Sequence, residues 1–412
     1  MELMPGYKQT DVGVIPEDWE LISIGKAGQV LGGRQRSPHY VGPLCKYLRV
    51  ANVFDGFLKT EDVLEMPFSP AEKERFLLKV GDILLNEGQS IELVGRGAIY
   101  RGIPNDCCFQ NTLLRFRSNR GTCREFAQVV FQRYRGLGVF ASIASQTTSI
   151  AHLGAGRFAA LQMPAPFLPE QRAIAKALSD ADALIESLER FIAKKRHLKQ
   201  GAMQELLRPK DGWVLKRLRD LGWTFGGLTG KTKSDFGEGK ERYITFMNIM
   251  SNVLIDCGTL EYVKVSPGES QNRVMKGDLF FNGSSETPEE VGMCAILTED
   301  LQNVFLNSFC FGFRFHKASE VDGIYLTYFF RSGQGRELLK SLAQGATRYN
   351  LSKIALLGLV FPIPGLSEQT AIASVFTDMD AEIAALETKL AKTRQLKQGM
   401  MQNLLTGKIR LI

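Results

Sequence analysis

A stretch of 40 residues in the middle of the chain occurs again near its end. The copies span residues 168–207 and 366–405, align without a gap at an offset of 198, and are identical at 23 of the 40 positions. A period this long is not that of a solenoid built from short repeats. The sequence therefore predicts a duplicated unit, in which a globular domain is followed by one of these stretches in each half of the chain.

Each copy is predicted to form one long helix. Apolar residues step by four and three along residues 174–192 of the first copy and along residues 372–390 of the second. Such a seam is typical of helices that wrap on one another. About 37 residues at 1.5 Å each give a rod of roughly 55 Å. The alternative is that the copies are ordinary amphipathic helices in separate cores.

The apolar seam is interrupted at equivalent points of the two copies. It falls on Lys195 and Thr393, and leucines follow at Leu198 and Leu206 in the first copy and at Leu396 and Leu404 in the second. We interpret the interruption as a phase shift rather than the end of the helix, and we expect the seam to resume through those leucines.

The order of charges predicts how the two helices pair. In both copies acidic residues precede basic ones: Glu170, Asp180, Asp182, Glu186 and Glu189 before Arg190, Lys194, Lys195, Arg196 and Lys199, and Glu368, Asp378, Asp380, Glu382 and Glu387 before Lys389, Lys392, Arg394 and Lys397. Parallel helices would place like charges together. Exposed ion pairs contribute little one by one, but their sum favours an antiparallel pair with a pseudo-twofold axis. The basic ends could instead contact DNA or a partner, although pairing with the other helix is the favoured interpretation.

Length and composition limit the classes of protein to which the chain can belong. Its 412 residues suffice for two or three domains, and its net charge of +7 is compatible with nucleic-acid binding without proving it. No signal peptide is expected, and no run approaches the 18 apolar residues of a membrane span. Seven cysteines without C-x-x-C spacing, beside four histidines, favour buried reduced thiols in the cytoplasm over a zinc site.

The segments that precede the two copies also correspond, although less closely. KYLRVANVF at 46–54 matches RYITFMNIM at 242–250, and VGDILLN at 80–86 matches KGDLFFN at 276–282, each at an offset of 196. These runs are predicted to be short strands. The loops that follow them differ in sequence, which indicates one scaffold with two unlike sets of binding loops.

We therefore predict an α+β fold. Two globular domains of mixed strands and short helices are expected at residues 1–165 and 208–364. Two long antiparallel coiled-coil helices with pseudo-twofold symmetry are expected to join them, at residues 166–207 and within residues 365–412 together with a tail. The tail after Gly407 is expected to pack on the N-terminal domain, because a cyclic repeat would bring the chain ends together.

Three motifs resemble the specificity subunit of type I restriction-modification systems. They are YKQTDVGVIPEDWE at 7–20, the exits PAPFLPEQRAIA and PIPGLSEQTAIA into the long helices, and the helix ends LKQGAMQELL and LKQGMMQNLLTGKIR. Together they span most of the chain.

The resemblance implies a DNA-binding subunit that is not itself catalytic. Each of two target-recognition domains would read one half of a bipartite sequence in double-stranded DNA. The long helices would set the spacing and dock two methyltransferase subunits, and motor-nuclease subunits join in complete systems. S-adenosylmethionine, ATP and magnesium would then belong to those partners, and this chain would hold no cofactor.

The loops supply candidate DNA contacts. Arginine can pair with guanine and glutamine with adenine in the major groove, and lysines are expected to hold phosphates rather than read bases. In the first domain the candidates are Arg34, Gln35, Arg36, Gln89, Ser90, Arg96, Gln146, Thr147 and Thr148. In the second they are Thr229, Lys231, Thr232, Lys233, Ser284, Ser285, Thr287, Arg348, Tyr349 and Asn350. The alternative is that these residues form exposed polar turns. Asn52 and Asn248, in the repeated strands, are expected to be structural.

No segment supplies a complete catalytic motif. GGLTGKT at 226–232 lacks the first glycine of a Walker motif, since Phe225 stands in its place. The chain has neither the Asn-Pro-Pro-aromatic motif of adenine methylation nor a Gly-rich cofactor loop. We expect no catalytic or metal-binding residues. An enzyme with a DNA-reading half, and a coiled-coil adaptor without DNA binding, are the rival functions.

Overall fold

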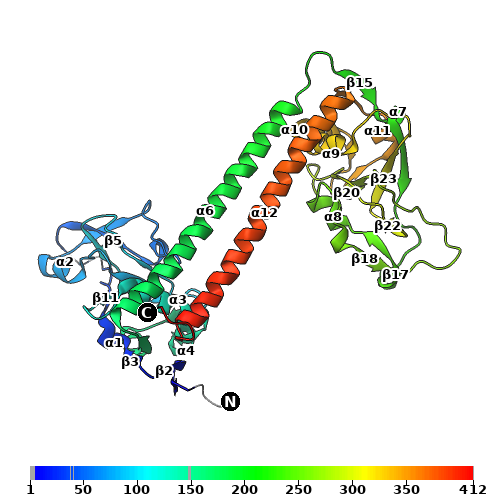
Figure 1. Cartoon of the computed structure of the whole chain (residues 1–412). Helices are drawn as coiled ribbons and strands as arrows, with labels where there is room; N and C mark the ends of the chain where they lie inside the picture. The colour runs from blue at the N-terminus through cyan, green and yellow to red at the C-terminus, as the bar shows by residue number, and fades with distance from the viewer. Residues whose placement is uncertain (1–4, 38, 40, 147–149, 412) are drawn as a thin grey trace. The chain divides into compact units, whose positions relative to one another are not determined.

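The chain folds into two compact units. The computed structural model describes residues 5–37, 39, 41–146 and 150–411. Unit 1 is Met1–Glu189 with Lys389–Ile412, and unit 2 is Arg190–Thr388. Each unit contains one domain, the first half of the helix that follows this domain, and the second half of the other long helix (Figure 1). The division cuts through both long helices, and the domain boundaries stated above stay a prediction.

The domain of unit 1 is built on a four-stranded antiparallel sheet with the order β4-β11-β7-β9. Smaller sheets have the orders β10-β5-β6, β12-β13-β8, β14-β3 and β1-β2. The strands are β1 (Tyr7–Thr10), β2 (Gly13–Pro16), β3 (Glu20–Ser23), β4 (Gly28–Gly32), β5 (Leu44–Leu48), β6 (Leu64–Pro67), β7 (Ile83–Asn86), β8 (Gly88–Gln89), β9 (Gly97–Ile99), β10 (Cys107–Phe109), β11 (Leu113–Ser118), β12 (Ser145–Gln146), β13 (Ala151–His152) and β14 (Gln162–Ala165). The helices are α1 (Ile24–Ala27), α2 (Pro70–Phe76), α3 (Arg124–Gly136), α4 (Val139–Ile143), α5 (Ala155–Ala160) and the front of α6 (Leu168–Leu206).

The domain of unit 2 repeats this plan. Its four-stranded sheet has the order β16-β23-β19-β21, and smaller sheets have the orders β18-β17-β22, β20-β25-β24 and β15-β26. The strands are β15 (Val214–Arg217), β16 (Gly222–Gly226), β17 (Phe236–Ile244), β18 (Glu261–Val263), β19 (Leu279–Asn282), β20 (Ser284–Ser285), β21 (Cys294–Ile296), β22 (Val304–Leu306), β23 (Cys310–Phe315), β24 (Ala343–Gln344), β25 (Tyr349–Leu351) and β26 (Val360–Ile363). The helices are α7 (Leu218–Leu221), α8 (Phe246–Ser251), α9 (Gly323–Arg331), α10 (Gly333–Ser341), α11 (Lys353–Leu357) and the front of α12 (Leu366–Leu404).

The repeated Gly-Asp dipeptide directly precedes the equivalent strand in both domains, β7 in unit 1 and β19 in unit 2. Gly81 adopts a φ of +99°, which favours glycine, and the following Asp82 accepts two hydrogen bonds from Arg117 at 2.6 and 2.7 Å. In unit 2 Asp278 and Arg314 form the same bidentate pair at 2.8 and 2.7 Å. Both aspartates are buried, so the arginine compensates a charge that would otherwise be costly inside the domain.

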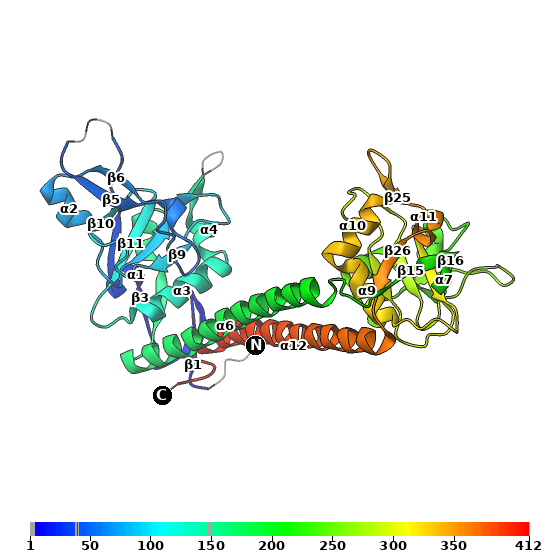
Figure 2. The same ribbon diagram turned by 90° about the horizontal axis from the view of Figure 1, so that it is seen from above.

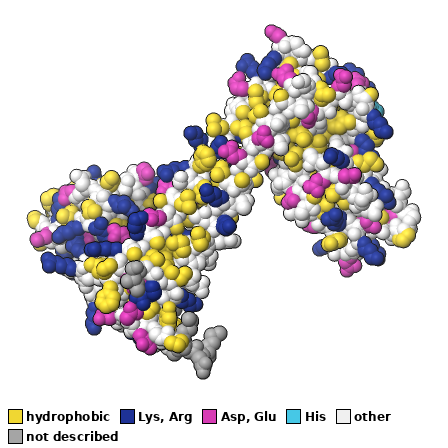
Figure 3. All heavy atoms as spheres, in the orientation of Figure 1, with side chains coloured by type: hydrophobic (Ala, Val, Ile, Leu, Met, Phe, Trp, Pro, Cys, Tyr) yellow, Lys and Arg dark blue, Asp and Glu magenta, His cyan; other side chains and the backbone are white. Residues whose placement is uncertain are grey.

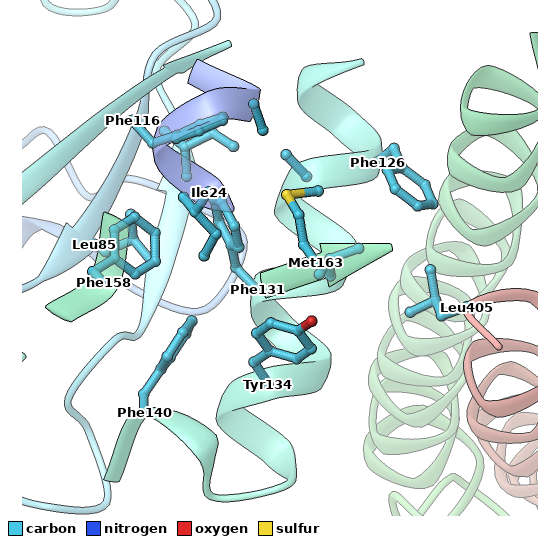
Figure 4. Close-up of a cluster of buried hydrophobic side chains, with 14 of the residues drawn as sticks. Ile24, Leu85, Phe116, Phe126, Phe131, Tyr134, Phe140, Phe158, Met163 and Leu405 are labelled. Atoms are coloured by element: carbon cyan, nitrogen blue, oxygen red, sulfur yellow. The ribbon is translucent and has the colours of Figure 1, made fainter. Parts of the chain in front are cut away.

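An aromatic cluster between the sheet and the helices forms the main core of unit 1. The ring of Phe131 on α3 contacts Phe116 of the sheet and Phe158 of α5, with both centroid separations 5.1 Å. Leu405, just beyond the end of α12, belongs to the same cluster (Figure 4). Helix α3 lies between the four-stranded sheet and α6 (Figure 2). The long helix is therefore fixed to its domain through α3.

Both expected strands at 46–54 and 242–250 are in part helical, since in unit 1 β5 ends at Leu48 and a 3-10 helix spans Val50–Asn52. Within residues 242–250, β17 ends at Ile244, and α8 begins two residues later after Thr245, whose hydroxyl accepts from the Asn248 N–H at 3.1 Å. The β-rich composition concealed this helix cap. Asn248 is structural, as expected: its amide pairs with the backbone N–H and C=O of Asp256 at 3.0 and 2.9 Å. Asn52 of unit 1 likewise binds two backbone carbonyls.

The predicted phase shift is wrong at Leu198 and Leu396, whereas Leu206 packs on the core of unit 2 and Leu404 on the core of unit 1. Leu198 and Leu396 are 51% and 64% exposed. The spacing of four and three instead continues through Lys195 and Lys199 in α6, and through Thr393 in α12. Only 18% of the Lys199 side chain is exposed, and Thr393 is 9% exposed. A lysine stem can cover apolar surface while its ammonium group reaches a polar partner, so the seam needs no leucine there.

The antiparallel pairing of α6 and α12 is confirmed by ion pairs inside each unit. In unit 1, Asp182 and Glu189 of α6 pair with Lys397 and Arg394 of α12, each at 2.5 Å. In unit 2 the same two pairs recur with the helices exchanged, as Lys199–Asp380 at 2.5 Å and Arg196–Glu387 at 2.6 Å. Lys195 adds a further pair with Glu382. Several basic residues of the helix ends therefore pair with the opposite helix, the favoured interpretation of the sequence.

The tail packs on the N-terminal segment of unit 1, as expected. The Tyr7 hydroxyl donates to the Gly407 carbonyl at 2.9 Å. Arg410 donates to both carboxylate oxygens of Asp18 at 2.9 and 2.8 Å, and to both of Glu170 at 2.6 and 2.9 Å. The Trp19 indole also donates to Glu170. The beginning of the chain, its end and the start of α6 therefore meet in one polar network.

Candidate nucleic-acid interface

Two loops that are far apart in the sequence meet in one small sheet in unit 1. Gln89 of β8 pairs with Ala151 of β13, which pairs in turn with Gln146 of β12. The Leu153 N–H donates to the Glu87 carbonyl at 2.8 Å and so joins the ends of the two loops. This three-stranded sheet places the candidates Gln89 and Gln146 on one polar structure. Thr147 and Thr148 lie outside the described residues.

Unit 2 builds the same sheet from different side chains. Ser284 and Ser285 of β20 pair with Asn350 and Tyr349 of β25, and Gln344 of β24 also pairs with Asn350. The Leu351 N–H donates to the Gly283 carbonyl at 2.9 Å, as Leu153 does in unit 1. The structure thus brings together four of the predicted residues, with Arg348 exposed at the adjoining turn. We name the two structures, β12-β13-β8 and β20-β25-β24, the reading sheets.

Neighbouring groups hold each reading sheet in place. In unit 1, Arg157 of α5 donates to the Ser145 hydroxyl at 2.9 Å and to the His152 carbonyl at 2.7 Å. His152 Nδ1 lies 3.1 Å from the Glu87 carboxylate. In unit 2, Ser285 donates to Glu290 at 3.0 Å. Sequence patterns missed Ser145 and Gln344, because the strand pairing that adds them to the sheet is not a local feature.

Arg34 lies in the interior of its domain. It is 5% exposed, and its guanidinium donates to both oxygens of Glu72, at 2.8 and 3.0 Å, and to the Pro67 carbonyl. Hydrogen bonds from Arg34 and from the Ser69 backbone hold the pKa of Glu72 at about 2. The charge of Arg34 is therefore compensated inside the domain, which distinguishes it from the exposed Gln35 and Arg36.

The same ion pair occurs at the equivalent place in unit 2. Lys231 pairs with Glu269 at 2.6 Å and donates to the Lys264 carbonyl at 2.7 Å, and its side chain is 6% exposed. Hydrogen bonds from Lys231, from Gln271 and from the Ser266 backbone hold the pKa of Glu269 at about 2. In each domain the acid stands 38 residues after the base. The spacing could have identified these two cations as structural.

The Gly-Gly dipeptide before each of these cations lets two backbone segments approach closely. A Cβ on Gly33 would stand 2.1 Å from the Gln110 carbonyl oxygen, and one on Gly227 would stand 2.1 Å from that of Asn307. The Asn111 N–H also donates to the Arg34 carbonyl at 3.0 Å. Exposed Asn111 is thereby placed beside Gln35 and Arg36, which motif spacing alone did not indicate.

The remaining candidates occupy turns or partly buried positions. Ser90, Arg96 and Ser284 are partly buried, whereas Thr232, Lys233 and Thr287 are exposed. The Arg96 guanidinium lies 4.7 Å from the Phe54 ring centroid, and burial lowers its pKa. The Thr229 backbone and the Gln271 side chain exchange two hydrogen bonds. DNA contact by any of these residues stays a prediction.

The long helices expose apolar side chains away from their seam. Leu184, Phe191 and Leu198 of α6 and Leu396 of α12 are each more than 40% exposed, and apolar side chains are visible on the face drawn in Figure 3. These side chains are accessible for contact with another protein.

No group of three His, Cys, Asp or Glu side chains in the described ranges is arranged to hold a metal ion. Within the same ranges, no helix has the length and apolar character needed to cross a membrane.

Comparison with known proteins identifies related chains. Residues 210–395 match the family model of the type I restriction modification DNA specificity domain. The putative type I restriction enzyme MjaX specificity subunit of Methanocaldococcus jannaschii is 25% identical, over 98% of this chain and 97% of that protein. The StySPI specificity subunit of Salmonella potsdam is 21% identical, over 96% and 90%.

Solved structures show the same fold. The S subunit of a type I restriction-modification system from M. genitalium superimposes with a TM-score of 0.56 and 15% identity, covering 98% of this chain and 99% of that one. The HsdS subunit from Thermoanaerobacter tengcongensis superimposes with a TM-score of 0.51 and 16% identity, covering 96% and 98%.

Proposed function

Because the chain belongs to the type I restriction-modification specificity subunits, which recognise DNA and are not catalytic, we propose that its two reading sheets recognise the two halves of one bipartite DNA sequence. The observation that supports this is the duplication itself. The same small sheet is built twice on the same frame, with Gln89, Ser145 and Gln146 in one copy and Ser284, Tyr349 and Asn350 in the other. Unlike side chains on a like frame would recognise unlike bases.

The partners follow from the same proposal. Two methyltransferase subunits dock on the paired helices, whose exposed apolar side chains suit protein contacts, and motor-nuclease subunits join in a complete system. S-adenosylmethionine, ATP and magnesium serve those partners, and this chain acts in the cytoplasm without a cofactor. Purified chain should bind duplex DNA with an affinity that falls steeply as salt rises, because phosphate contacts release counterions.

The decisive experiment exchanges one reading sheet. Residues 283–291 and 343–351 are replaced by those of another family member, and adenine methylation is mapped across the genome of cells that express the chain with its methyltransferase partner. We expect one half of the methylated motif to change and the other to persist as an internal control. The reciprocal exchange, at residues 87–94 and 145–153, should change the other half. Exchanges that alter both halves would overturn the proposal.

A further inference from the structure

Unit 1 contains a cavity that the proposed DNA contacts do not use. Its volume is about 700 Å³, within the range of small-molecule sites. The β1–β2 hairpin, the C-terminal half of α3, α4 and the residue after α12 enclose it. Val130, Leu137, Val139, Ile143, Leu161 and Leu405 supply much of its apolar lining. Tyr134 and Leu405, drawn in Figure 4, belong to this lining.

Two arginines line this otherwise largely apolar cavity. Among the described residues, the Arg133 guanidinium has no carboxylate partner, and burial lowers the pKa of this group. Arg157 donates to the Ser145 hydroxyl and to the carbonyls of His152 and Leu153, none of which has a charge. Asp11 is the single acid in the lining, and it is exposed. The cavity therefore has an excess positive charge that burial makes costly and that an anion would compensate.

The equivalent positions in unit 2 have different side chains. The two domains can be aligned through the first residue of α3 and of α9, so that Val130 corresponds to Phe329 and Arg133 to Ser332. Phe329 is 1% exposed and packs 5.5 Å from the Phe361 ring. The Ser332 hydroxyl accepts from a backbone N–H and caps α10. In unit 1 the smaller Val130 and the cationic Arg133 occupy these two positions and line the cavity.

We propose that this cavity binds a small organic anion with an apolar body, such as a medium-chain or aromatic carboxylate. The apolar lining receives the body of the ligand, and Arg133 receives the carboxylate. Arg157 of α5 also lines the cavity and is a second donor. Arg157 also contacts the reading sheet of unit 1, but the lining contains none of the proposed DNA contacts, and the site does not depend on the proposed DNA recognition.

The test measures binding of decanoate to the full chain by isothermal titration calorimetry. Saturable binding is expected, and uncharged decanol should bind about tenfold more weakly. Arg133→Ser, which introduces the residue of unit 2, should weaken decanoate binding by at least about tenfold. Val130→Phe should fill the cavity and weaken binding to a similar extent or abolish it.

Val129 and Arg101 supply two matched controls. Val129 and Arg101 line a separate cleft, so Val129→Phe and Arg101→Ser should change decanoate affinity by less than about twofold. Circular dichroism checks the folding of Val130→Phe, and Arg133→Ser tests the proposal even if that variant unfolds. The proposal fails if neither decanoate nor 4-phenylbutyrate binds, if decanol binds equally well, if the controls match the test variants, or if an acidic peptide binds and the small acids do not.

Discussion

In each unit a glutamine, Gln171 or Gln369, attaches the start of the long helix to its domain by hydrogen bonds that we call the joint. The two joints are alike, whereas the residues around them differ. In unit 1, Gln171 at the start of α6 accepts from the Cys123 N–H at 2.8 Å and donates to the Pro166 carbonyl at 2.8 Å. In unit 2, Gln369 at the start of α12 accepts from the Asp322 N–H and donates to the Pro364 carbonyl, again at 2.8 Å. The glutamine of the shared E-Q dipeptide thus fastens each long helix to the helix that packs on its domain.

The acid that precedes this glutamine has a different environment in each unit. Glu170 is buried beneath Trp19 and Arg410, and its partners come from both ends of the chain. Glu368 is exposed and pairs with Lys210 at 3.3 Å. The buried Trp213 Nε1 has no hydrogen-bond partner among the residues that the structure describes. In unit 1 the chain ends must be held together by side chains, whereas in unit 2 the continuous chain does this. The glutamine contacts are therefore the same in both units. The environments of Glu170 and Glu368 differ because unit 1 contains the two chain ends and unit 2 does not.

The largest expected difference between the units is the loss of stability when the basic partner of Glu170 or of Glu368 is removed. Arg410→Ala should destabilise unit 1 by about 3–5 kcal/mol, because it leaves the buried Glu170 carboxylate without its cation. Lys210→Ala, the matched change in unit 2, removes an exposed pair and should cost less than about 1 kcal/mol. Hydrogen exchange followed by mass spectrometry separates the two units. Equal losses in the two variants would show that the tail does not close unit 1.

The shared joint should respond equally in both units. Gln171→Ala and Gln369→Ala each leave buried backbone groups without a partner, and each should cost about 2–3 kcal/mol in its own unit. Exposed Gln402 on α12 supplies the control, since Gln402→Ala should change stability by less than about 0.5 kcal/mol. Urea unfolding monitored by the same exchange method gives the comparison. A difference above about 1 kcal/mol between the two joints would contradict their equivalence.

The sequence predicted the features that depend on repetition and on charge order along a helix. The antiparallel helices followed from acidic halves preceding basic halves, and the closure of the tail followed from the cyclic repeat. The prediction that the apolar seam shifts its phase was wrong, because it did not allow for lysines that both cover the seam and form ion pairs. Lys199 and Lys397 occupy the seam because their stems are apolar and their ammonium groups meet Asp380 and Asp182.

The candidate site was predicted less fully, because long-range pairing determines it. The loops around Gln89 and Gln146 were identified separately, and only the strand register shows that they form one sheet. Arg34 and Lys231 were chosen as contacts for their chemistry. Each instead pairs with an acid 38 residues away, and a local reading of the loop cannot reveal such a partner.

The smallest expected effect concerns the ion pairs Arg34–Glu72 and Lys231–Glu269, and its measurement tests whether the two pairs are equivalent. Both Glu72 and Glu269 have a pKa of about 2, lowered by Arg34 and by Lys231. A lowered pKa in the folded state stabilises the protein above the unfolded pKa of about 4.3, and this contribution is lost as pH falls towards 2. Glu72→Gln should therefore cost roughly 1 kcal/mol at pH 7, and the gap from the unmodified chain should narrow below pH 4. Glu269→Gln should show the same direction of pH dependence in unit 2. Thermal midpoints from pH 7 to 2.5 provide the measurement, and a gap that widens on acidification in either variant would mean that the pair does not stabilise its domain.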